Sequence, residues 1–295
     1  MNMQQIVLWI VFLFSVEAIA QEKIKILSWN VKMLPKVCHS FSKNDKIWQE
    51  IRLDQIIDFL KTSTSDIIQL QEVFDKQAVS RIKAELKEKF PYIILPESQF
   101  LKFSNGLMIL SKITIKKEKT IFFQNHKLHD ALVSKGATLC SFENNFQKMY
   151  MVNTHLQSDY KLATSELLRG QQLNQIVEEI INPILSEEAP ILLAGDYNFD
   201  FHSNEYNGFV SKTGVKETFF KDRSIQYTFD NKNYWNKDAK PEQLDHVFVL
   251  DRNNVLDCSK LSLIAPKMNE LVDYSDHYGL EICLTFSNKF FVLEK

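Results

Sequence analysis

The chain has 295 residues, of which 35 are basic and 37 acidic, so its formal charge of −2 gives no overall attraction to a polyanion. This balance weighs weakly against a nucleic-acid substrate, because a local basic patch could still exist. With only 7 Gly and 7 Pro and no Pro-, Gly- or Ser-rich linker, the chain is typical of one large α/β domain with continuous elements.

The N-terminus resembles a secretory signal peptide. Residues 6–16 form an apolar stretch, and the small residues Ala18 and Ala20 follow it at the spacing of a cleavage site. The stretch is too short to span a bilayer, which needs about 20 residues. The alternatives are a buried N-terminal strand or an uncleaved anchor. We expect residues 1–20 to be removed, leaving residues 21–295 as a single catalytic domain in an extracellular protein.

The first third of the chain alternates predicted strands and helices. Residues 23–30 predict a strand, and apolar positions at helical spacing over 51–60 predict a helix. A short buried strand is expected over 67–72. A surface helix over 76–90 then ends before Pro91.

The rest of the chain is richer in strands and contains one further long helix, expected over 165–185. Strands are predicted over residues 93–95, 107–110, 137–142, 148–155, 191–196, 244–250 and 278–286. The strands in the middle of the chain follow one another as in hairpins, whereas those nearer the two ends of the chain are connected through helices. This order predicts an α/β fold, a four-layer α/β/β/α sandwich of two packed mixed sheets flanked by helices.

Polar residues stand at the ends of six of these apolar runs. They are Asn30, Glu72, His155, Asp196 with Asn198, Asp245 and His277. A lone carboxylate, amide or imidazole in a buried sheet costs a few kcal/mol unless it is satisfied. Six such ends therefore indicate a shared polar site, which could hold a divalent cation and activate a water.

Glu72 and Asn30 are the candidate metal ligands. Glu72 ends a buried strand, and its hard oxygen atoms suit Mg²⁺. Oxygen-rich sites also accept Mn²⁺ or Co²⁺. The alternative for Glu72 is a favourable charge at the start of the following helix, and the alternative for Asn30 is a turn.

Asp196 and Asn198 follow Gly195 at the end of a strongly apolar strand. If the chain stays extended, two residues spaced by two project to the same side. One could then orient a water and the other bind a phosphate oxygen. The alternative is an Asx turn after a buried strand.

His277 is the candidate general base, and Asp245 is its natural partner, which would fix the tautomer and stabilise the imidazolium. His155 could donate a hydrogen bond to a transferring phosphoryl group. The alternative for either histidine is a satisfied structural residue.

Two other features carry less information. The four cysteines, Cys38, Cys140, Cys258 and Cys283, lack C-x-x-C spacing, which disfavours a zinc site and leaves disulfide pairing open. The basic run at 116–119 is typical of a solvated strand end or turn.

The ordered set of polar strand ends resembles the endonuclease/exonuclease/phosphatase superfamily, which has the deoxyribonuclease I-like fold. Within it, the segments at 29–35, 70–75, 153–157 and 273–278 are similar to those of secreted neutral sphingomyelinases. Those members also carry an Asp five residues before a Lys, and Asp130 with Lys135 fits that pattern. The alternative for this pair is a loop ion pair of little energetic value.

The resemblance implies a role for each residue. Asn30 and Glu72 would hold Mg²⁺, while Asp196 and Asn198 would position the attacking water and the phosphate. His277, oriented by Asp245, would take the proton of the water, and His155 would stabilise the charge on phosphorus. Asp130 and Lys135 would help to bind the phosphodiester.

The reaction implied by the resemblance is hydrolysis of sphingomyelin to ceramide and phosphocholine, by a monomer acting at the bilayer surface and without nucleic acid. Lys32 tells against abasic-site endonucleases, which have Asp there, and the segment 243–247 lacks the Arg-rich signature of inositol polyphosphate phosphatases. The remaining alternatives are a secreted nuclease of the same fold, and a toxin or binding subunit that has lost catalysis.

Two family features are missing from the sequence. Bacterial haemolytic sphingomyelinases carry an aromatic-tipped hairpin before the Ser-Asp-His motif, where this chain has only residues 266–272, and a disulfide between central strands. Three aromatic pairs are candidates for membrane contact instead, although aromatic pairs also form cores. They are Phe122 with Phe123, Tyr234 with Trp235, and Phe290 with Phe291.

Overall fold

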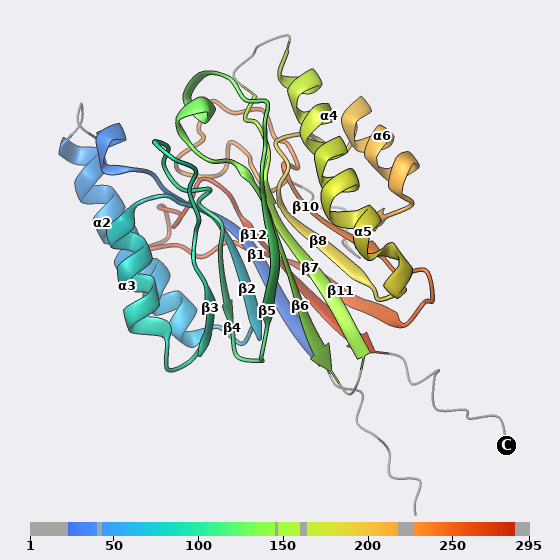
Figure 1. Ribbon diagram of the computed structural model, residues 1–295. Helices are drawn as coiled ribbons and strands as arrows, with labels where there is room; N and C mark the ends of the chain where they lie inside the picture. Colours follow the sequence, from blue (N-terminus) through green and yellow to red (C-terminus); the bar gives the residue numbers. More distant parts are fainter. Residues whose placement is uncertain (1–22, 40–42, 145–146, 160–163, 218–226, 287–295) are drawn as a thin grey trace, which may run out of the picture.

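The computed structural model describes residues 23–39, 43–144, 147–159, 164–217 and 227–286 (Figure 1). Two six-stranded mixed sheets pack face to face, and helices cover the outer face of each. The predicted four-layer sandwich is confirmed. The signal-peptide prediction for residues 1–20 lies outside the described residues. No helix in the described part of the chain is long and apolar enough to cross a membrane.

The first sheet has the strand order β11-β12-β1-β2-β4-β3. Its strands are β1 (Lys23–Met33), β2 (Ile67–Val73), β3 (Tyr92–Ile94), β4 (Met108–Ser111), β11 (Leu256–Ile264) and β12 (Gly279–Phe286). β1 and β2 run parallel, whereas the other neighbours are antiparallel. Helices α2 (Lys43–Thr62) and α3 (Lys76–Leu86) cover its outer face, where Leu53, Ile57 and Ile82 pack on strand residues.

The second sheet has the order β5-β6-β7-β8-β10-β9. Its strands are β5 (Lys116–Phe122), β6 (Gly136–Asn144), β7 (Gln147–His155), β8 (Ile191–Asp196), β9 (Lys216–Glu217) and β10 (Asp245–Leu250). Again a single neighbouring pair, β7 and β8, is parallel. The 3-10 turns η2 (Lys36–His39), η3 (Leu128–Leu132) and η5 (Leu185–Glu187) lie in connections.

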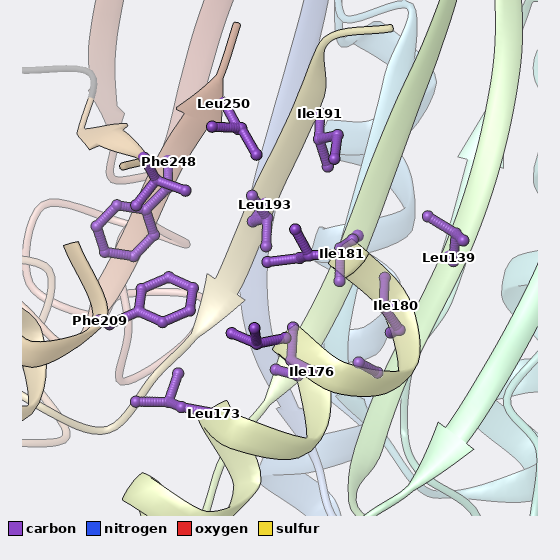
Figure 2. Close-up of a cluster of buried hydrophobic side chains, with 14 of the residues drawn as sticks. Leu139, Leu173, Ile176, Ile180, Ile181, Ile191, Leu193, Phe209, Phe248 and Leu250 are labelled. Atoms are coloured by element: carbon purple, nitrogen blue, oxygen red, sulfur yellow. The ribbon is translucent and has the colours of Figure 1, made fainter. Parts of the chain in front are cut away.

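Helices α4 (Ser165–Ile176), α5 (Asn182–Ile184) and α6 (Asn204–Thr213) belong to the outer layer of the second sheet. Figure 2 shows Ile176 and Ile181 facing Leu193 of β8, and Phe209 of α6 facing Phe248 of β10. These side chains are buried, so the layer is attached to the sheet by apolar packing.

The predicted helix over 165–185 is one continuous helical path, but the π turn η4 (Val177–Ile181) interrupts it. Pro183, at the start of α5, has no amide hydrogen to give to the carbonyl group of Glu179 one turn earlier. That carbonyl group accepts a hydrogen bond from Lys119 Nζ at 3.0 Å instead. The irregular turn therefore has a local cause and a replacement donor.

Some strand and helix bounds differ from the prediction. β1 continues to Met33, beyond Asn30, and α3 ends at Leu86 because the next residues form a turn before Pro91. Strands β5, β9 and β11 and helix α6 were not predicted. β5 begins with the basic run at 116–119, whose lysines pair with Glu118, Glu97 and Glu179. Ion pairs thus allow a highly charged sequence to form an edge strand.

The two sheets meet through an interior that is largely apolar and becomes polar toward one end. Ile67 and Ile282 of the first sheet and Met151 and Leu192 of the second belong to one buried cluster. Closer to the end of the sandwich, Gln71 Nε2 donates to Asn153 Oδ1 at 2.8 Å, across the interface. This bond fixes the end of β2 against the end of β7, where the polar side chains gather.

Gly195 allows β7 and β8 to approach closely. A Cβ atom at this position would lie 2.0 Å from the carbonyl oxygen of Thr154, and its φ of +150° is one that other residues rarely adopt. The next residue is Asp196, so this glycine sets the position of a candidate catalytic carboxylate.

We expect Gly195→Ala to lower the free energy of unfolding by on the order of 3 kcal/mol, because the added methyl group meets backbone. Urea unfolding measures this change. Gly208→Ala is the matched control: it lies in exposed α6 with nothing within 4 Å, so it should stabilise by about 0.5–1 kcal/mol. Equal stability of the two variants would contradict the close approach.

Candidate active site

The six predicted strand ends lie together at one end of the sandwich. Asn30 and Glu72 come from parallel strands β1 and β2, and His155 and Asp196 from parallel strands β7 and β8. Strands β10 and β12 run antiparallel to these pairs and begin at the same end. They place Asp245 at the first residue of β10 and His277 two residues before β12. The carboxyl ends of parallel strands thus supply four of the groups, and the start of antiparallel strands supplies two.

The backbone is distorted where Glu72 enters the site. The pairing of β1 with β2 shifts register between Asn30 and Met33, and Lys32 and Glu72 both have left-handed φ angles, 49° and 59°. Such conformations are costly for residues other than glycine and concentrate at functional sites. The N-cap of α3 is Asp75, which accepts from the Ala78 amide, so Glu72 does not cap this helix.

Glu72, His155 and Asp196 form the candidate cation site. One ligand atom from each lies within 4.8 Å of the others. His155 Nε2 is 3.5 Å from Asp196 Oδ2 and 3.9 Å from Glu72 Oε1. Loss of water contact raises the pKa of Glu72, and burial together with the neighbouring Asp245 raises the pKa of Asp196 to about 7. The carboxylates of Glu72 and Asp196, with the neutral imidazole of His155 nearby, fit a hard divalent cation, which would stabilise both carboxylates as anions.

Asn30 bridges the two carboxylates, but through its nitrogen. Nδ2 donates to Glu72 Oε1 at 3.1 Å and to Asp196 Oδ2 at 2.9 Å. Its oxygen accepts from the Lys32 amide at 3.1 Å. The predicted role of Asn30 as a metal ligand therefore requires the amide to rotate, at the cost of the hydrogen bond from Lys32.

His277 and Asp245 form the second cluster, next to the first. Nδ1 of His277 lies 2.8 Å from Asp245 Oδ2, while its Nε2 faces Asp196 Oδ2 at 3.8 Å. Trp29 Nε1 donates to the His277 carbonyl group at 2.9 Å, and the ring of Phe229 packs beside the imidazole. The imidazole is thus held with Nδ1 toward its carboxylate and Nε2 toward the candidate cation site.

The charge of His277 depends on its neighbours. Burial alone would lower its pKa, but Asp245, Asp196 and Asp276 outweigh burial and raise the pKa to about 10. These carboxylates therefore favour the imidazolium form of His277. A divalent cation beside Glu72 and Asp196 would repel that charge and lower the pKa of His277, toward the value that a general base needs.

Lys135 lies on the other side of His155. Its ammonium group is 3.0 Å from Asp130 Oδ2 and 2.9 Å from His155 Nε2, and it donates to the Leu156 carbonyl group and the Ser158 hydroxyl. Lys135 and Asp130 are both buried, so the pair differs from the exposed loop ion pair considered as the alternative.

Lys135 also determines the role open to His155. Burial, Lys135 and His277 all lower the pKa of His155 well below its usual value. An ammonium group can only donate, so Nε2 of the neutral imidazole accepts from Lys135. In this arrangement Nε2 cannot donate to a phosphoryl group unless Lys135 withdraws, and the nearest available donor is Lys135 itself.

Asn198 lies beside the site in a turn rather than an extended segment. Its φ is +54°, its amide donates to Asp196 Oδ1 at 3.0 Å, and Nδ2 donates to the Leu156 carbonyl group at 3.2 Å. The extended geometry assumed from the spacing is wrong, and the Asx turn is present. This turn binds Oδ1 of Asp196 and leaves Oδ2 to face Asn30, His155 and His277.

Three supporting residues were not predicted from the sequence as part of the site. Lys32 Nζ lies 2.7 Å from Asp276 Oδ2, and Arg52 of α2 donates to the carbonyl groups of Lys32 and Tyr274. Burial would raise the pKa of Asp276, but Lys32 and His277 outweigh it and lower the pKa to about 2. Thr228 Oγ1 accepts from the Asp245 amide at 3.0 Å. No local pattern marks these residues, because their partners are distant in sequence.

A cavity of about 160 Å³ opens beside the cluster. Glu72, Asp130, Lys135 and His155 form its polar side. Its other side is apolar, and the side chains there include Leu34, Pro35, Val37, Phe74, Phe103, Leu132 and Val133. The site therefore suits a molecule with a charged group and an apolar part.

Comparison with known proteins agrees with this geometry. Residues 27–277 match the Endonuclease/Exonuclease/phosphatase family. Sphingomyelinase C 2 of Leptospira interrogans is 25% identical over 249 residues, which cover 77% of this chain and 39% of that protein. The chain thus spans about two fifths of the length of this relative.

Solved structures share the fold. The crystal structure of SmcL has a TM-score of 0.75 at 22% identity and covers 89% of this chain and 99% of its own. A Staphylococcus aureus beta toxin variant with bound magnesium ions has a TM-score of 0.70 at 20% identity, covering 88% of this chain and 99% of its own.

We expect Asp245→Asn to lower the pKa of His277 by at least about 1 unit, because a carboxylate that favours the imidazolium is removed. NMR titration of the imidazole in EDTA measures this pKa. Asp54→Asn, on the exposed surface of α2, is the control and should leave the titration unchanged. An unaltered pKa in Asp245→Asn would argue against the coupling of His277 to Asp245.

Proposed function

We propose that this chain, which belongs to the Endonuclease/Exonuclease/phosphatase family, is a secreted Mg²⁺-dependent phosphodiesterase that hydrolyses sphingomyelin to ceramide and phosphocholine. The observation that carries the proposal is the orientation of His277. Asp245 holds Nδ1 at 2.8 Å, and Nε2 faces the carboxylates of the candidate cation site. A general base oriented beside a cation site is the arrangement that water-mediated phosphodiester cleavage requires.

The cation would be held by Glu72 and Asp196, with Asn30 completing the set of ligands after its amide rotates, because the lone pair of His155 Nε2 accepts from Lys135. When bound, Mg²⁺ neutralises charge on a phosphate oxygen and makes water more acidic. The Staphylococcus aureus toxin that shares this fold has bound magnesium ions, which supports the choice of metal. Mn²⁺ and Co²⁺ are substitutes that such an oxygen-rich site also accepts.

The proton of the attacking water passes to Nε2 of His277. Asp245 fixes the tautomer in which Nε2 is free to accept, and it stabilises the imidazolium that forms. Asp196 Oδ2 lies next to Nε2 and can hold the water for in-line attack on phosphorus. The proton then leaves His277 toward solvent or the ceramide oxygen, which restores the neutral imidazole.

The phosphate would lie between the carboxylate cluster and Lys135. The ammonium group of Lys135 is fixed by Asp130 and can donate to a phosphate oxygen. Asn198, held in its turn beside Leu156, and His155 complete this side of the site. Lys135 would exchange one of its present acceptors (His155, Leu156 or Ser158) for the phosphate oxygen, and its charge would then stabilise the negative charge that develops on the phosphate.

Sphingomyelin is favoured over a nucleic acid by three observations. The chain is nearly neutral, the cavity beside the cluster is largely apolar, and the Leptospira relative is a sphingomyelinase C. Secretion is supported by the signal-like residues 1–20. The protein would act as a monomer on the lipid surface, and the cleaved chain 21–295 would be the active form.

We expect His277→Gln to reduce phosphocholine release from sphingomyelin vesicles by on the order of 10³-fold or more, because Gln cannot accept and return the proton. EDTA should abolish release by the wild type. His202→Gln is the control, since His202 is exposed, belongs to neither cluster of the site and has its ring tilted against that of Phe201. Full activity of His277→Gln would exclude it as the base, and plasmid nicking without phosphocholine release would point to a nuclease.

A second experiment tests the cation site without turnover. We expect Mg²⁺ at millimolar concentration to raise the thermal unfolding temperature of the wild type, because the folded state alone presents the ligands. Glu72→Gln should lose this shift. Glu118→Gln, which removes an acid of edge strand β5, should keep it. An equal shift in Glu72→Gln and wild type would place the cation elsewhere.

A further inference from the structure

We infer that the loop between β3 and β4, tipped by Phe100 and Leu101, docks this protein on a phospholipid bilayer with the candidate active site facing the lipid. The inference rests on the proposed function, since it explains how a lipid phosphodiesterase without the family's aromatic hairpin could reach a substrate in a membrane. The loop itself has the form of a short apolar-tipped hairpin.

The tip of this loop is exposed and strained. Phe100 and Leu101 are 89% and 88% exposed, and Leu101 has a left-handed φ of +60°. Below the tip, Ser98 pairs with Ser104 and the Asn105 amide donates to the Glu97 carbonyl group at 2.6 Å. Glycine or asparagine adopts such a left-handed turn at lower cost than leucine does. Polar side chains also interact with water more favourably than apolar side chains do. An apolar pair held outward at this cost indicates a surface that meets an apolar environment.

The tip belongs to a larger surface, the apolar rim, made by Val37, Phe100, Leu101, Phe103 and Leu132. Hydrogen bonds join two of its segments: the Phe103 amide donates to the Leu132 carbonyl group at 2.9 Å, and the Ser134 amide donates to the Phe103 carbonyl group. The described residues include 12 large apolar side chains that are exposed, and the rim accounts for five of them. This is a concentration rather than the usual scatter of single residues.

The apolar rim is continuous with the candidate active site. Val37, Phe103 and Leu132 line the cavity of about 160 Å³ that also contains Glu72, Lys135 and His155. In Figure 1, the β3–β4 loop and the η3 segment rise from the same end of the sandwich. A lipid whose phosphate reaches Lys135 would therefore keep its hydrocarbon part against the rim and the bilayer.

Charge around the rim fits the phosphate layer of a membrane. A second hollow, of about 540 Å³, adjoins the loop and is lined by Leu101, Phe103, Lys76 and Lys102. None of the ten described residues that line it is acidic. Lys36 is also exposed beside Val37. Lysines next to apolar side chains favour a lipid interface, because the ammonium groups reach lipid phosphates while the apolar groups enter the hydrocarbon boundary.

The aromatic pairs predicted for membrane contact are less suitable. Phe123 is buried, and Trp235 is half-buried against Trp48 and Arg52. Phe290 and Phe291 lie outside the described residues. The sequence alone did not single out Phe100 and Leu101, because nothing in it distinguishes an exposed loop tip from a core segment.

The test compares Phe100→Ser/Leu101→Asn with wild type in co-sedimentation with vesicles of equal parts phosphatidylcholine and sphingomyelin, in EDTA so that no lipid is hydrolysed. Asn tolerates the left-handed backbone at position 101. We expect the double variant to lose vesicle binding by about tenfold or more, as two large apolar groups are removed. Tyr92→Ser is the matched control. Tyr92 is exposed and pairs with Ser111, at the end of the sheet remote from Glu72.

A second variant adds a direct readout. Phe100→Trp keeps the apolar surface, and its fluorescence should be quenched by brominated phosphatidylcholine in the same vesicles. Wild type that does not bind the vesicles, a double variant that binds as tightly as wild type, or equal loss in Tyr92→Ser would each overturn the inference. Light scattering gives one further outcome that would overturn the inference. In that outcome the wild type forms a dimer, and the double variant disrupts this dimer without any change in vesicle binding.

Turnover separates this inference from the proposed function. The double variant should hydrolyse sphingomyelin vesicles more slowly than wild type by a factor similar to its loss of binding. It should hydrolyse the water-soluble substrate 4-nitrophenyl phosphorylcholine at the wild-type rate, because that reaction needs no membrane. Vesicle binding that depends on the loop, in a protein that cleaves neither substrate, would support docking and contradict the proposed function.

Discussion

The carboxylate of Asp196 is the group on which the rest of the site depends. Its Oδ2 atom lies 2.9 Å from Asn30 Nδ2, 3.5 Å from His155 Nε2 and 3.8 Å from His277 Nε2, so it belongs to both candidate clusters. Burial makes an isolated charge there unfavourable, and the surrounding donors and imidazolium compensate. A cation would compensate more fully. The metal site and the general base are therefore electrostatically coupled through one buried side chain.

This coupling is possible because the two sheets of the sandwich contain the same arrangement of strands. Each sheet contains a single parallel pair, β1 with β2 and β7 with β8, and the two pairs pack with their carboxyl ends together. Gly195 and the Gln71–Asn153 hydrogen bond fix how closely those ends approach. At the site, left-handed φ angles occur at Lys32, Glu72 and Asn198, where the strands end, while an apolar cluster fills the interior behind them. Stability and function thus occupy different parts of the same strands.

Around this centre the molecule changes from charged to apolar within one cavity. Lys135 and Asp130 lie on the side of the carboxylates, whereas Phe103 and Leu132 lead outward to the exposed tip of the β3–β4 loop. A substrate with a phosphodiester and hydrocarbon chains matches both halves. A polyanion matches the first half alone, and a chain of nearly neutral charge gives it no wider attraction.

The sequence by itself determined the fold class and the main site residues, because buried strands have a strong apolar pattern and Glu72, His155 and Asp196 interrupt that pattern where strands end. It could not show β5, where Lys117 and Lys119 pair with the distant acids Glu97 and Glu179, or the pairing of Lys32 with Asp276, 244 residues apart. The left-handed turn at Glu72, the acceptor role of His155 Nε2 and the exposure of Phe100 were decided by the tertiary structure alone, whereas the Asx turn at Asn198 is local and was an alternative that the sequence offered. The first three of these features depend on contacts between segments that are remote in sequence, and local sequence propensities cannot predict such contacts.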